Sequence, residues 1–260
     1  MPQNNAHYEI KDQVAVVTIK NPPLNCLDAG TKEDIGQAFT EVARFRPGVR
    51  AVVLTGSGER AFAAGADLKS FLEFDPKAAK VYLSRSQEIY TAIRDFPCPV
   101  IAAIRGYCLG GGLELALHCD IRYAANNARL GFPEVNHSLF PGHSGARSAL
   151  QHIPLGKLKE LVFTGRLINA DEAFRLGLVE EVFEPHLVFA KALELAREIA
   201  AKGPLGVTAA KKALNISSDP AGDQGIESVI DLWAGLTATS DMKEGVRAFM
   251  EKRPPEFKAK

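Results

Sequence analysis

Two segments rich in glycine and alanine, about 40 residues apart, are the part of this chain best suited to carry chemistry. Residues 61–69 read AFAAGADLK, and residues 101–116 read IAAIRGYCLGGGLELA. Small side chains allow a ligand to reach the backbone, so the N–H groups themselves can act as donors. Two such loops at two strand ends predict an oxyanion hole. It would stabilise an enolate or a tetrahedral oxyanion at a carbonyl.

The glycine run at residues 110–112 has other readings. It is also compatible with a plain strand-to-helix turn. A phosphate cradle is disfavoured, because the run lacks the lysine of a P-loop and the spacing of a dinucleotide fingerprint. The run precedes an expected helix, whose unpaired N–H groups and dipole favour negative charge. Together with Ala66, this position favours the oxyanion site.

Two glutamates are candidates for proton transfer. Glu114 follows the glycines at the start of the expected helix, and Glu134 follows a strand in the sequence GFPE. Taken singly, Glu114 is more simply a first-turn carboxylate that the helix dipole stabilises, and Glu134 a loop carboxylate or helix cap. If both converge on the oxyanion site, they form an acid/base pair, poised by burial and mutual repulsion.

Other polar residues fit ordinary structural roles better. Asp67 is expected to be a cap or a hydrogen-bonding group rather than a catalyst. His137 and His143 lie near Glu134 but have no metal-ligand spacing, so we expect no metal site and favour packing or surface roles over a place in the lining of a pocket. Ser144 lacks the context of a nucleophile elbow, which argues against a serine hydrolase.

The strands and helices that the sequence predicts alternate along the chain, and they would position these residues. We expect strands at 14–19, 49–55, 99–104 and 121–124, and helices at 76–95 and 112–118. Thr31 and Asp34 have the spacing of a capping box, which predicts the start of another helix. This alternation indicates an α/β fold with parallel strands.

The C-terminal part is helical by pattern. The expected helices cover residues 187–201, 204–214, 224–238 and 242–253. We place a boundary near residue 195, which divides the chain into a catalytic core at 1–195 and a helical region at 196–260. The second part is too short to bury a large core alone, and an exposed apolar face there would favour packing on another subunit.

Composition excludes several classes of protein. The 260 residues are 46% hydrophobic, and 31 Lys and Arg balance 31 Asp and Glu. The chain therefore lacks the basic excess of a nucleic-acid binder. Its four cysteines have no CxxC spacing, so a disulfide framework or zinc site is not expected. The polar first 11 residues carry no signal pattern, and no apolar run approaches the ~18 residues of a membrane helix. These features predict a soluble cytoplasmic protein.

The two small-residue segments, with residues 132–134 (FPE) and Pro141-Gly142, resemble the signature of the enoyl-CoA hydratase/isomerase (crotonase) family. The resemblance covers nearly the whole chain. It includes the stretches 21–27 (NPPLNCL), 163–166 (FTGR), 176–179 (LGLV) and 244–257. Several independent motifs in the right order make it specific at the level of the family.

The resemblance implies a fold and a ligand. The fold would be a spiral of ββα turns with a C-terminal helical region that drives trimerisation, and two trimers would stack into a hexamer. The ligand would be an acyl-CoA thioester whose carbonyl accepts hydrogen bonds from the N–H groups of Ala66 and Gly111. Trp233 and Lys252 would reach the adenine end of the coenzyme from a neighbouring subunit. The implied substrate contacts are Leu24, Ala64, Ala66, Asp67, Leu68, Lys69, Gly111, Trp233 and Lys252.

The resemblance also implies a reaction. Hydratases of the family carry glutamates at the positions of Glu114 and Glu134, which implies reversible syn addition of water across the 2,3 double bond of an enoyl-CoA. Glu134 would deliver the proton to C2, and Glu114 would help to activate the oxygen that attacks C3. Coenzyme A would be part of the substrate, and no further cofactor would be needed.

Residues 135–147 depart from the family pattern, because they keep Pro-Gly but lack the Gly-Gly that many relatives have. This leaves the acyl preference open. An alternative is a dehydratase or double-bond isomerase that acts on a cyclic, branched or hydroxylated acyl-CoA. A third reading is an acyl-CoA-binding protein without catalysis, which both intact glutamates disfavour.

Overall fold

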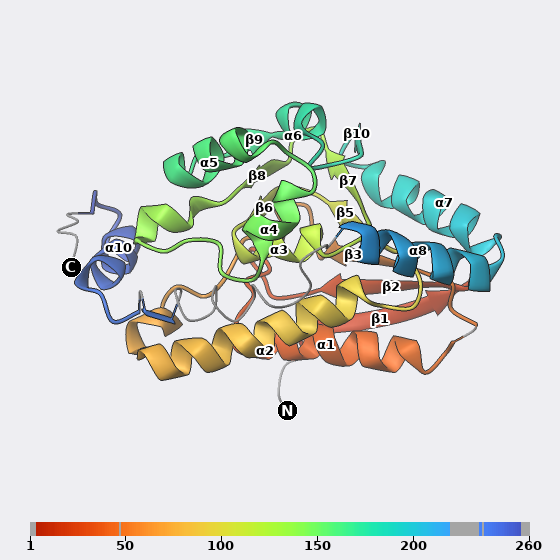
Figure 1. The fold of residues 1–260 in the computed structure, drawn as a ribbon, viewed down its shortest axis with the longest axis horizontal. Coiled ribbons are helices and arrows are strands. Elements are labelled where there is room, and N and C mark those ends of the chain that lie inside the picture. The colour runs from red at the N-terminus through yellow and green to blue at the C-terminus, as the bar shows by residue number, and fades with distance from the viewer. Residues whose placement is uncertain (1–3, 47, 219–233, 236, 256–260) are drawn as a thin grey trace.

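The computed structural model describes residues 4–46, 48–218, 234–235 and 237–255. Figure 1 shows the strands in the middle of the molecule, with helices below, above and to the right of them. Strands and helices alternate along most of the chain. The fold is α/β, as the sequence predicts.

A six-stranded sheet runs through the described core. In spatial order its strands are β1 (Ala6–Lys11), β2 (Val14–Ile19), β3 (Ala51–Gly56), β5 (Val100–Ile104), β7 (Ile121–Ala125) and β10 (Glu181–Phe183). β1 is antiparallel to β2, and the other neighbours are parallel. Parallel strands are usually covered on both faces. Accordingly, every residue of β3 and β5 is buried.

A second sheet of four short strands lies against the first. Its strands are β4 (Ala61–Ala63), β6 (Tyr107–Leu109), β8 (Arg129–Gly131) and β9 (Ile168–Asn169). β4 follows β3, β6 follows β5 and β8 follows β7, so the chain repeatedly adds one strand to each sheet. Helices follow the first two of these strand pairs, which gives the ββα repeat that the resemblance implies.

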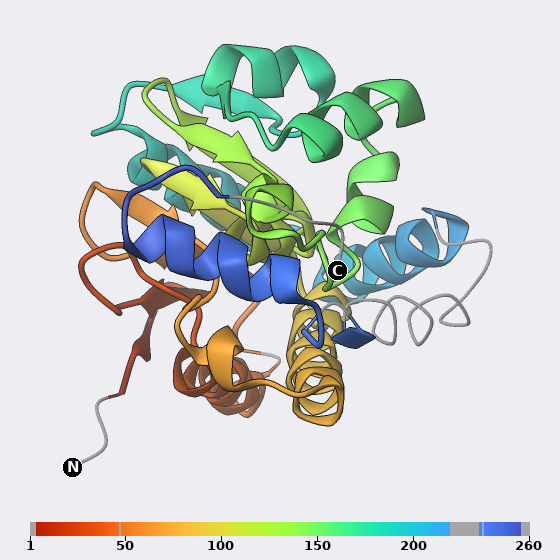
Figure 2. The same ribbon diagram turned by 90° about the vertical axis from the view of Figure 1, so that its left-hand side faces the viewer.

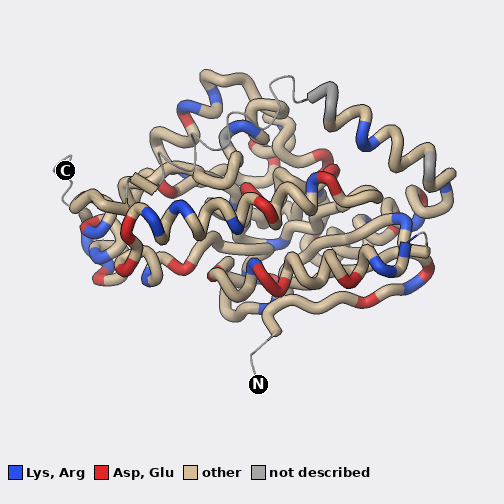
Figure 3. Tube along the Cα trace, turned by 60° about the horizontal axis from the view of Figure 1, so that its bottom comes forward, with Lys and Arg blue, Asp and Glu red and all other residues tan. Residues whose placement is uncertain are grey.

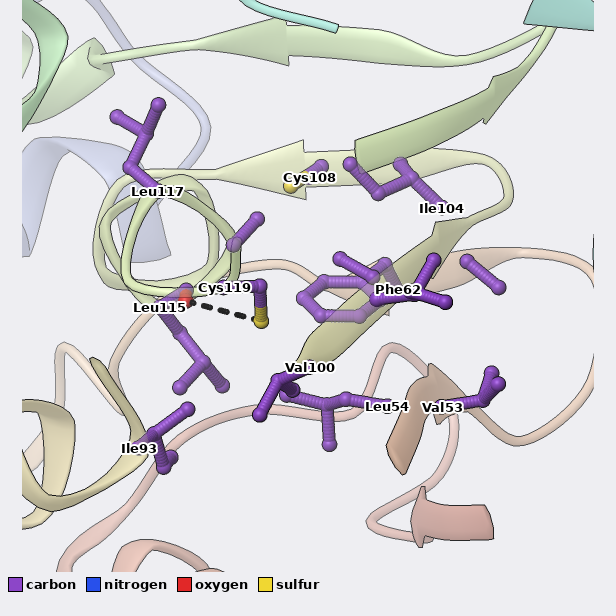
Figure 4. Close-up of a cluster of buried hydrophobic side chains, with 14 of the residues drawn as sticks. Val53, Leu54, Phe62, Ile93, Val100, Ile104, Cys108, Leu115, Leu117 and Cys119 are labelled. Carbon is purple, nitrogen blue, oxygen red and sulfur yellow. Dashed lines mark hydrogen bonds between the residues drawn. The ribbon is translucent and has the colours of Figure 1, made fainter. Parts of the chain in front are cut away.

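The core between the two sheets is closely packed. Figure 4 shows Phe62 of β4 and Cys108 of β6 among side chains of the large sheet, including Leu54 and Ile104. All four are completely buried. This packing fixes the ends of β4 and β6 relative to each other, and the two glycine-rich loops begin at those ends.

The helices follow the strands in the expected order. They are α1 (Ala29–Ala43), α2 (Pro76–Arg94), α3 (Gly111–Leu117), α4 (Gly145–Leu150), α5 (Leu155–Thr164), α6 (Ala170–Leu176), α7 (Val188–Ala200), α8 (Pro204–Ser218) and α10 (Ser240–Met250), with the 3₁₀ helices η1 (Ser70–Glu73) and η2 (Pro133–His137). The helices expected at 76–95, 187–201, 204–214 and 242–253 are confirmed, with ends that differ by up to four residues. The helix expected at 224–238 lies mostly outside the described residues.

The start of α1 differs from the prediction. The helix begins at Ala29, and its N-cap is Asp28, whose side chain accepts a hydrogen bond from the Thr31 N–H at 2.7 Å. The predicted capping pair has other partners. The Thr31 hydroxyl accepts a hydrogen bond from Asn21, and the Asp34 carboxylate accepts one from the backbone N–H of Asn5. These side chains therefore tie the N-terminal segment to α1 instead of capping it.

The C-terminal helices pack back on the core. Residue 195 lies inside α7, which contacts β3, β5 and β7. α10 lies beside η2 and η1, as Figures 1 and 2 show. The approach is closest at Gly245, where a Cβ would lie 2.5 Å from the His137 Cα. The division into a core and an oligomerisation region stays a prediction.

Charges are mixed over the described chain. Figure 3 shows basic and acidic residues interspersed along the helices and strands. Within the described residues, no helix combines the length and apolar character needed to cross a membrane.

Candidate active site

The first glycine-rich loop leaves β4 and turns sharply. Gly65 has a φ of 91°, a conformation that glycine adopts readily and other residues rarely do. The Gly65 carbonyl accepts a hydrogen bond from the Leu27 N–H at 2.8 Å, and the Ala64 N–H donates to the Leu24 carbonyl at 3.1 Å. Among the described residues, the Ala66 N–H has no hydrogen-bond acceptor. The loop therefore presents one fixed, unused donor.

The second loop joins β6 to α3. Gly110 has a φ of 52°, and its N–H donates to the Gly131 carbonyl at 3.0 Å. α3 begins at Gly111, whose N–H has no acceptor within the described chain. The buried Tyr90 hydroxyl donates to the Gly111 carbonyl at 3.0 Å and so holds this peptide from behind.

The two loops lie side by side because their glycines lack side chains. A Cβ at Gly65 would lie 3.1 Å from the Leu109 oxygen and 3.9 Å from the Gly111 nitrogen. A Cβ at Gly112 would lie only 2.1 Å from the Ala63 oxygen. The structure therefore places the two loops next to each other, and the oxyanion hole formed by their N–H groups stays a prediction.

The Glu134 carboxyl group lies over the second loop. It comes from η2, and a Cβ at Gly110 would lie 2.9 Å from its Oε1. The Glu134 Oε2 is buried and accepts no hydrogen bond from the described residues. Burial, and then the nearby charge of Glu114, raise the pKa of Glu134 well above its ordinary value. These effects favour the protonated form of Glu134.

The Glu114 carboxyl group has the opposite environment. Its Oε1 accepts hydrogen bonds from the backbone N–H groups of His143 (2.8 Å) and Gly145 (3.0 Å), and its Oε2 lies 2.8 Å from the His143 Nδ1. Burial acts to raise the pKa of Glu114, but His143 and these hydrogen bonds outweigh it and lower the pKa. The ionised form of Glu114 is therefore favoured, whereas the protonated form is favoured at Glu134.

This part of the site departs from one prediction. His143 is expected to have a packing or surface role, but it is 5% exposed and bonded to Glu114 through both its backbone and its ring. His137 fits the expectation, because its buried ring packs against Phe249.

Behind His143 lies a residue that the sequence reasoning missed. The Lys32 Nζ is 3.3 Å from the His143 Nε2, and Lys32 is only 2% exposed. The signal is present in the sequence, since Lys32 falls on the buried stripe of α1 with Ile35 and Phe39, at spacings of three and seven. A lysine at an apolar stripe position is unusual.

The remaining predicted residues lie in several places. Asp67 accepts a hydrogen bond from the Lys69 N–H at 3.1 Å, in line with the expected local role, and Leu68 lies between them, before η1. Lys252 is exposed just beyond the end of α10, and Trp233 lies outside the described residues. Within the described residues, no group of three or more His, Cys, Asp or Glu could hold a metal ion.

Comparison with known proteins identifies similar chains over the full length. The family model described as "Enoyl-CoA hydratase/isomerase" matches residues 9–260. The chain is 37% identical over 261 residues to the crotonyl-CoA hydratase of Syntrophomonas wolfei, covering 100% of each chain. It is 38% identical to the (E)-benzylidenesuccinyl-CoA hydratase of Thauera aromatica, covering 96% of this chain and 97% of the other.

Solved structures are also similar. The crystal structure of a carnitinyl-CoA hydratase from Mycobacterium avium has a TM-score of 0.85 and 34% sequence identity. It covers 99% of this chain and 100% of the other.

Proposed function

The chain belongs to the enoyl-CoA hydratase/isomerase family, and from that premise we propose that it adds water reversibly across the 2,3 double bond of an enoyl-CoA thioester. The observation that carries the proposal is the contrast between the two glutamates. The surroundings of Glu134 raise its pKa and those of Glu114 lower it, next to a pair of loops with unused N–H donors. Groups whose environments push their pKa values apart can act as acid and base at one pH.

Each glutamate has a distinct proton to move. The ionised Glu114 accepts a proton from water as the oxygen attacks C3, and the neutral Glu134 donates its proton to C2. The hydroxyl adds to C3 and the proton to C2 on the same side of the double bond, so the addition is syn, and return of a proton from Glu114 to Glu134 resets the pair. The unpartnered Glu134 Oε2 supports this role, since a buried polar atom without a partner is available to a ligand.

The thioester oxygen gains negative charge as C2 becomes enolate-like. We assign its stabilisation to the N–H groups of Ala66 and Gly111. Loss of one such donor typically costs about 2.7–4 kcal/mol of transition-state stabilisation.

The coenzyme A moiety would bind along the first loop. Its contacts are proposed to be Leu24, Ala64, Ala66, Asp67, Leu68 and Lys69, with Gly111 at the thioester. Trp233 and Lys252 of a neighbouring subunit would reach the adenine, in a trimer or a hexamer built from two trimers. The exposure of Lys252 is compatible with such a contact.

Membership of the family also bears on the cofactor and on the location of the protein. We infer that no additional cofactor is needed, because the acid, the base and the oxyanion donors are all protein groups. We also infer a cytoplasmic location, which is supported by four cysteines that are all unpaired, since thiols stay reduced in the cytosol.

Dehydration or double-bond isomerisation of a cyclic, branched or hydroxylated acyl-CoA is the second candidate. The contact of His143 with Glu114 supports this second candidate, because His143 belongs to the segment 135–147 that departs from the family pattern. The same acid and base would serve the reverse reaction.

The test is the loss of enoyl-thioester absorbance with crotonyl-CoA, in the wild type and in Glu134→Gln. The amide keeps the shape of Glu134 but has no proton to give, so kcat should fall by roughly 10²–10⁴-fold. Glu59→Gln, at an exposed glutamate, is the matched control and should leave kcat unchanged.

Each outcome decides between the candidates. Turnover in the wild type that collapses only in Glu134→Gln supports hydration. Binding of crotonyl-CoA without turnover would shift the assignment to a different acyl group. Full turnover in Glu134→Gln would refute the two-glutamate mechanism.

A further inference from the structure

Glu114 belongs to a longer buried chain of polar groups. His143 bridges two side chains, since its Nδ1 lies 2.8 Å from the Glu114 Oε2 and its Nε2 lies 3.3 Å from the Lys32 Nζ. Lys32 donates further hydrogen bonds to the hydroxyls of Tyr82 (2.6 Å) and Ser86 (2.8 Å). All three members of the chain Lys32–His143–Glu114 are at most 5% exposed.

We propose that Lys32 and His143 together form the buried counter-ion of Glu114, and that Lys32 is a positioning residue that acts on the base through His143. The proposal rests on the proposed function, because it concerns the base of that reaction. A buried carboxylate is costly without a compensating charge, and Lys32 is linked to Glu114 through one imidazole.

The groups that face Lys32 come from several elements. They are Asp28 at the start of α1, Tyr82 and Ser86 on α2, Glu114 on α3 and His143 between η2 and α4. Tyr82 also places its ring 3.8 Å from the Nζ, in a cation–π contact. No carboxylate of the described residues is bonded to the Lys32 Nζ. The hydrogen-bonded link from Lys32 to a carboxylate therefore runs through His143 to Glu114.

Lys32 and His143 share positive charge. Burial lowers the pKa of Lys32 to about 7, against the opposing charges of Glu114 and Asp28. Burial, and then the charge of Lys32, lower the pKa of His143. The two bases therefore compete for one proton, and in either arrangement the Nδ1–H remains directed at Glu114. Tyr90 packs against this ring and His118 packs against Tyr90, but neither carries a charge at neutral pH, because burial raises the pKa of Tyr90 and lowers that of His118 to about 4.

The decisive measurement is the pKa of Glu114, which does not depend on turnover. It is followed through the carboxyl ¹³C resonance of glutamate-labelled protein, assigned by its loss in Glu114→Gln. In Lys32→Met the lysine charge is gone and His143 alone is left to balance the carboxylate, so the pKa of Glu114 should rise by about one pH unit. An unchanged pKa would overturn the proposal.

The matched control is Lys211→Met. Lys211 is also a buried lysine, but it is paired with Asp120 at 2.7 Å. This variant should leave the pKa of Glu114 where it is. An equal rise in both variants would refute a specific link to Lys32.

A second variant covers the case in which Lys32→Met does not fold. His143→Gln keeps an amide N–H that can donate to Glu114 but removes the imidazole charge and its link to Lys32. The pKa of Glu114 should rise here as well, and an unchanged value would again overturn the proposal.

Kinetics then link the counter-ion to the reaction. With crotonyl-CoA, the acidic limb of kcat/KM in Lys32→Met should move to higher pH by the same amount as the pKa of Glu114. If the pKa of Glu114 changes but the acidic limb of kcat/KM does not move, Lys32 has no role in the reaction. If the wild type does not hydrate crotonyl-CoA, the proposed function fails, while the resonance measurement still decides the counter-ion.

Discussion

At the scale of single residues, the two glutamates of the site differ in what surrounds their oxygens. Glu114 is met by three hydrogen-bond donors, whereas the Glu134 Oε2 is met by none in the described chain. This contrast supports the proposed roles of Glu114 as the base and Glu134 as the acid. Burial alone would raise both pKa values, so the donors around Glu114 decide the outcome.

Lys32 gives a prediction for stability as a function of pH. Its pKa is about 7 in the folded protein and near 10.5 when unfolded, so the unfolded chain binds more protons between these values. The contribution of Lys32 to the free energy of unfolding therefore increases as the pH rises from about 7 to 10.5. We expect wild type to gain stability relative to Lys32→Met between pH 7 and 10, measured by denaturant unfolding.

The comparison with Lys32→Met removes the effect of titrating groups that do not interact with Lys32. A difference in stability between the two proteins that is constant over this window would contradict the prediction. A buried, charged Lys32 would thus lower the stability of the protein while it balances the charge of Glu114.

Sequence alone identified some of these residues and not others. Glu114, Glu134 and the glycine loops were predicted because each stands in a recognisable local motif. The contact of Lys32 with His143 joins positions 111 apart, and no local pattern encodes such a pair. Only the packing of α1 and α2 against residues 138–144 makes it visible.

At the scale of elements, the turn between β6 and α3 sets the position of Glu134. Gly110→Ala should strain a backbone with a φ of 52° and displace the Glu134 carboxyl, whose Oε1 would lie 2.9 Å from the new Cβ. We expect a loss of about 1–3 kcal/mol of stability and a fall in kcat. Thermal unfolding and the crotonyl-CoA assay measure the two effects.

Gly156→Ala is the matched control. Gly156 lies in α5, where a new Cβ would meet nothing within 4 Å. Alanine should raise stability there by up to about 1 kcal/mol without a change in kcat. Equal losses at Gly110 and Gly156 would show that the effect is not specific to the turn.

Elements were predicted unequally from the sequence. Longer helices such as α2 and α7 show clear periodicity, and their bounds agree with the structure to within a residue. β4, β6 and β8 have three residues each, which is too short for an alternating pattern to be recognised. The second sheet was therefore implied only by the family resemblance.

At the scale of the whole molecule, the number of subunits is the open prediction. A trimer should scatter light with three times the chain mass of 28.1 kDa, and a hexamer with six times. A large exposed apolar residue such as Phe163 or Leu214, 71% and 69% exposed, is a candidate for burial between subunits. A stable, fully active monomer would contradict the proposed adenine contacts from a neighbour.

The close approach of Gly245 to His137 has a consequence for how the protein is made. η2 carries Glu134, and α10 supports η2 from the far end of the chain, more than one hundred residues later. Both sheets and the two glycine loops are complete before α10 is translated. We therefore expect a nascent chain to fold its core first and to position Glu134 last, so that activity begins only after α10 has left the ribosome.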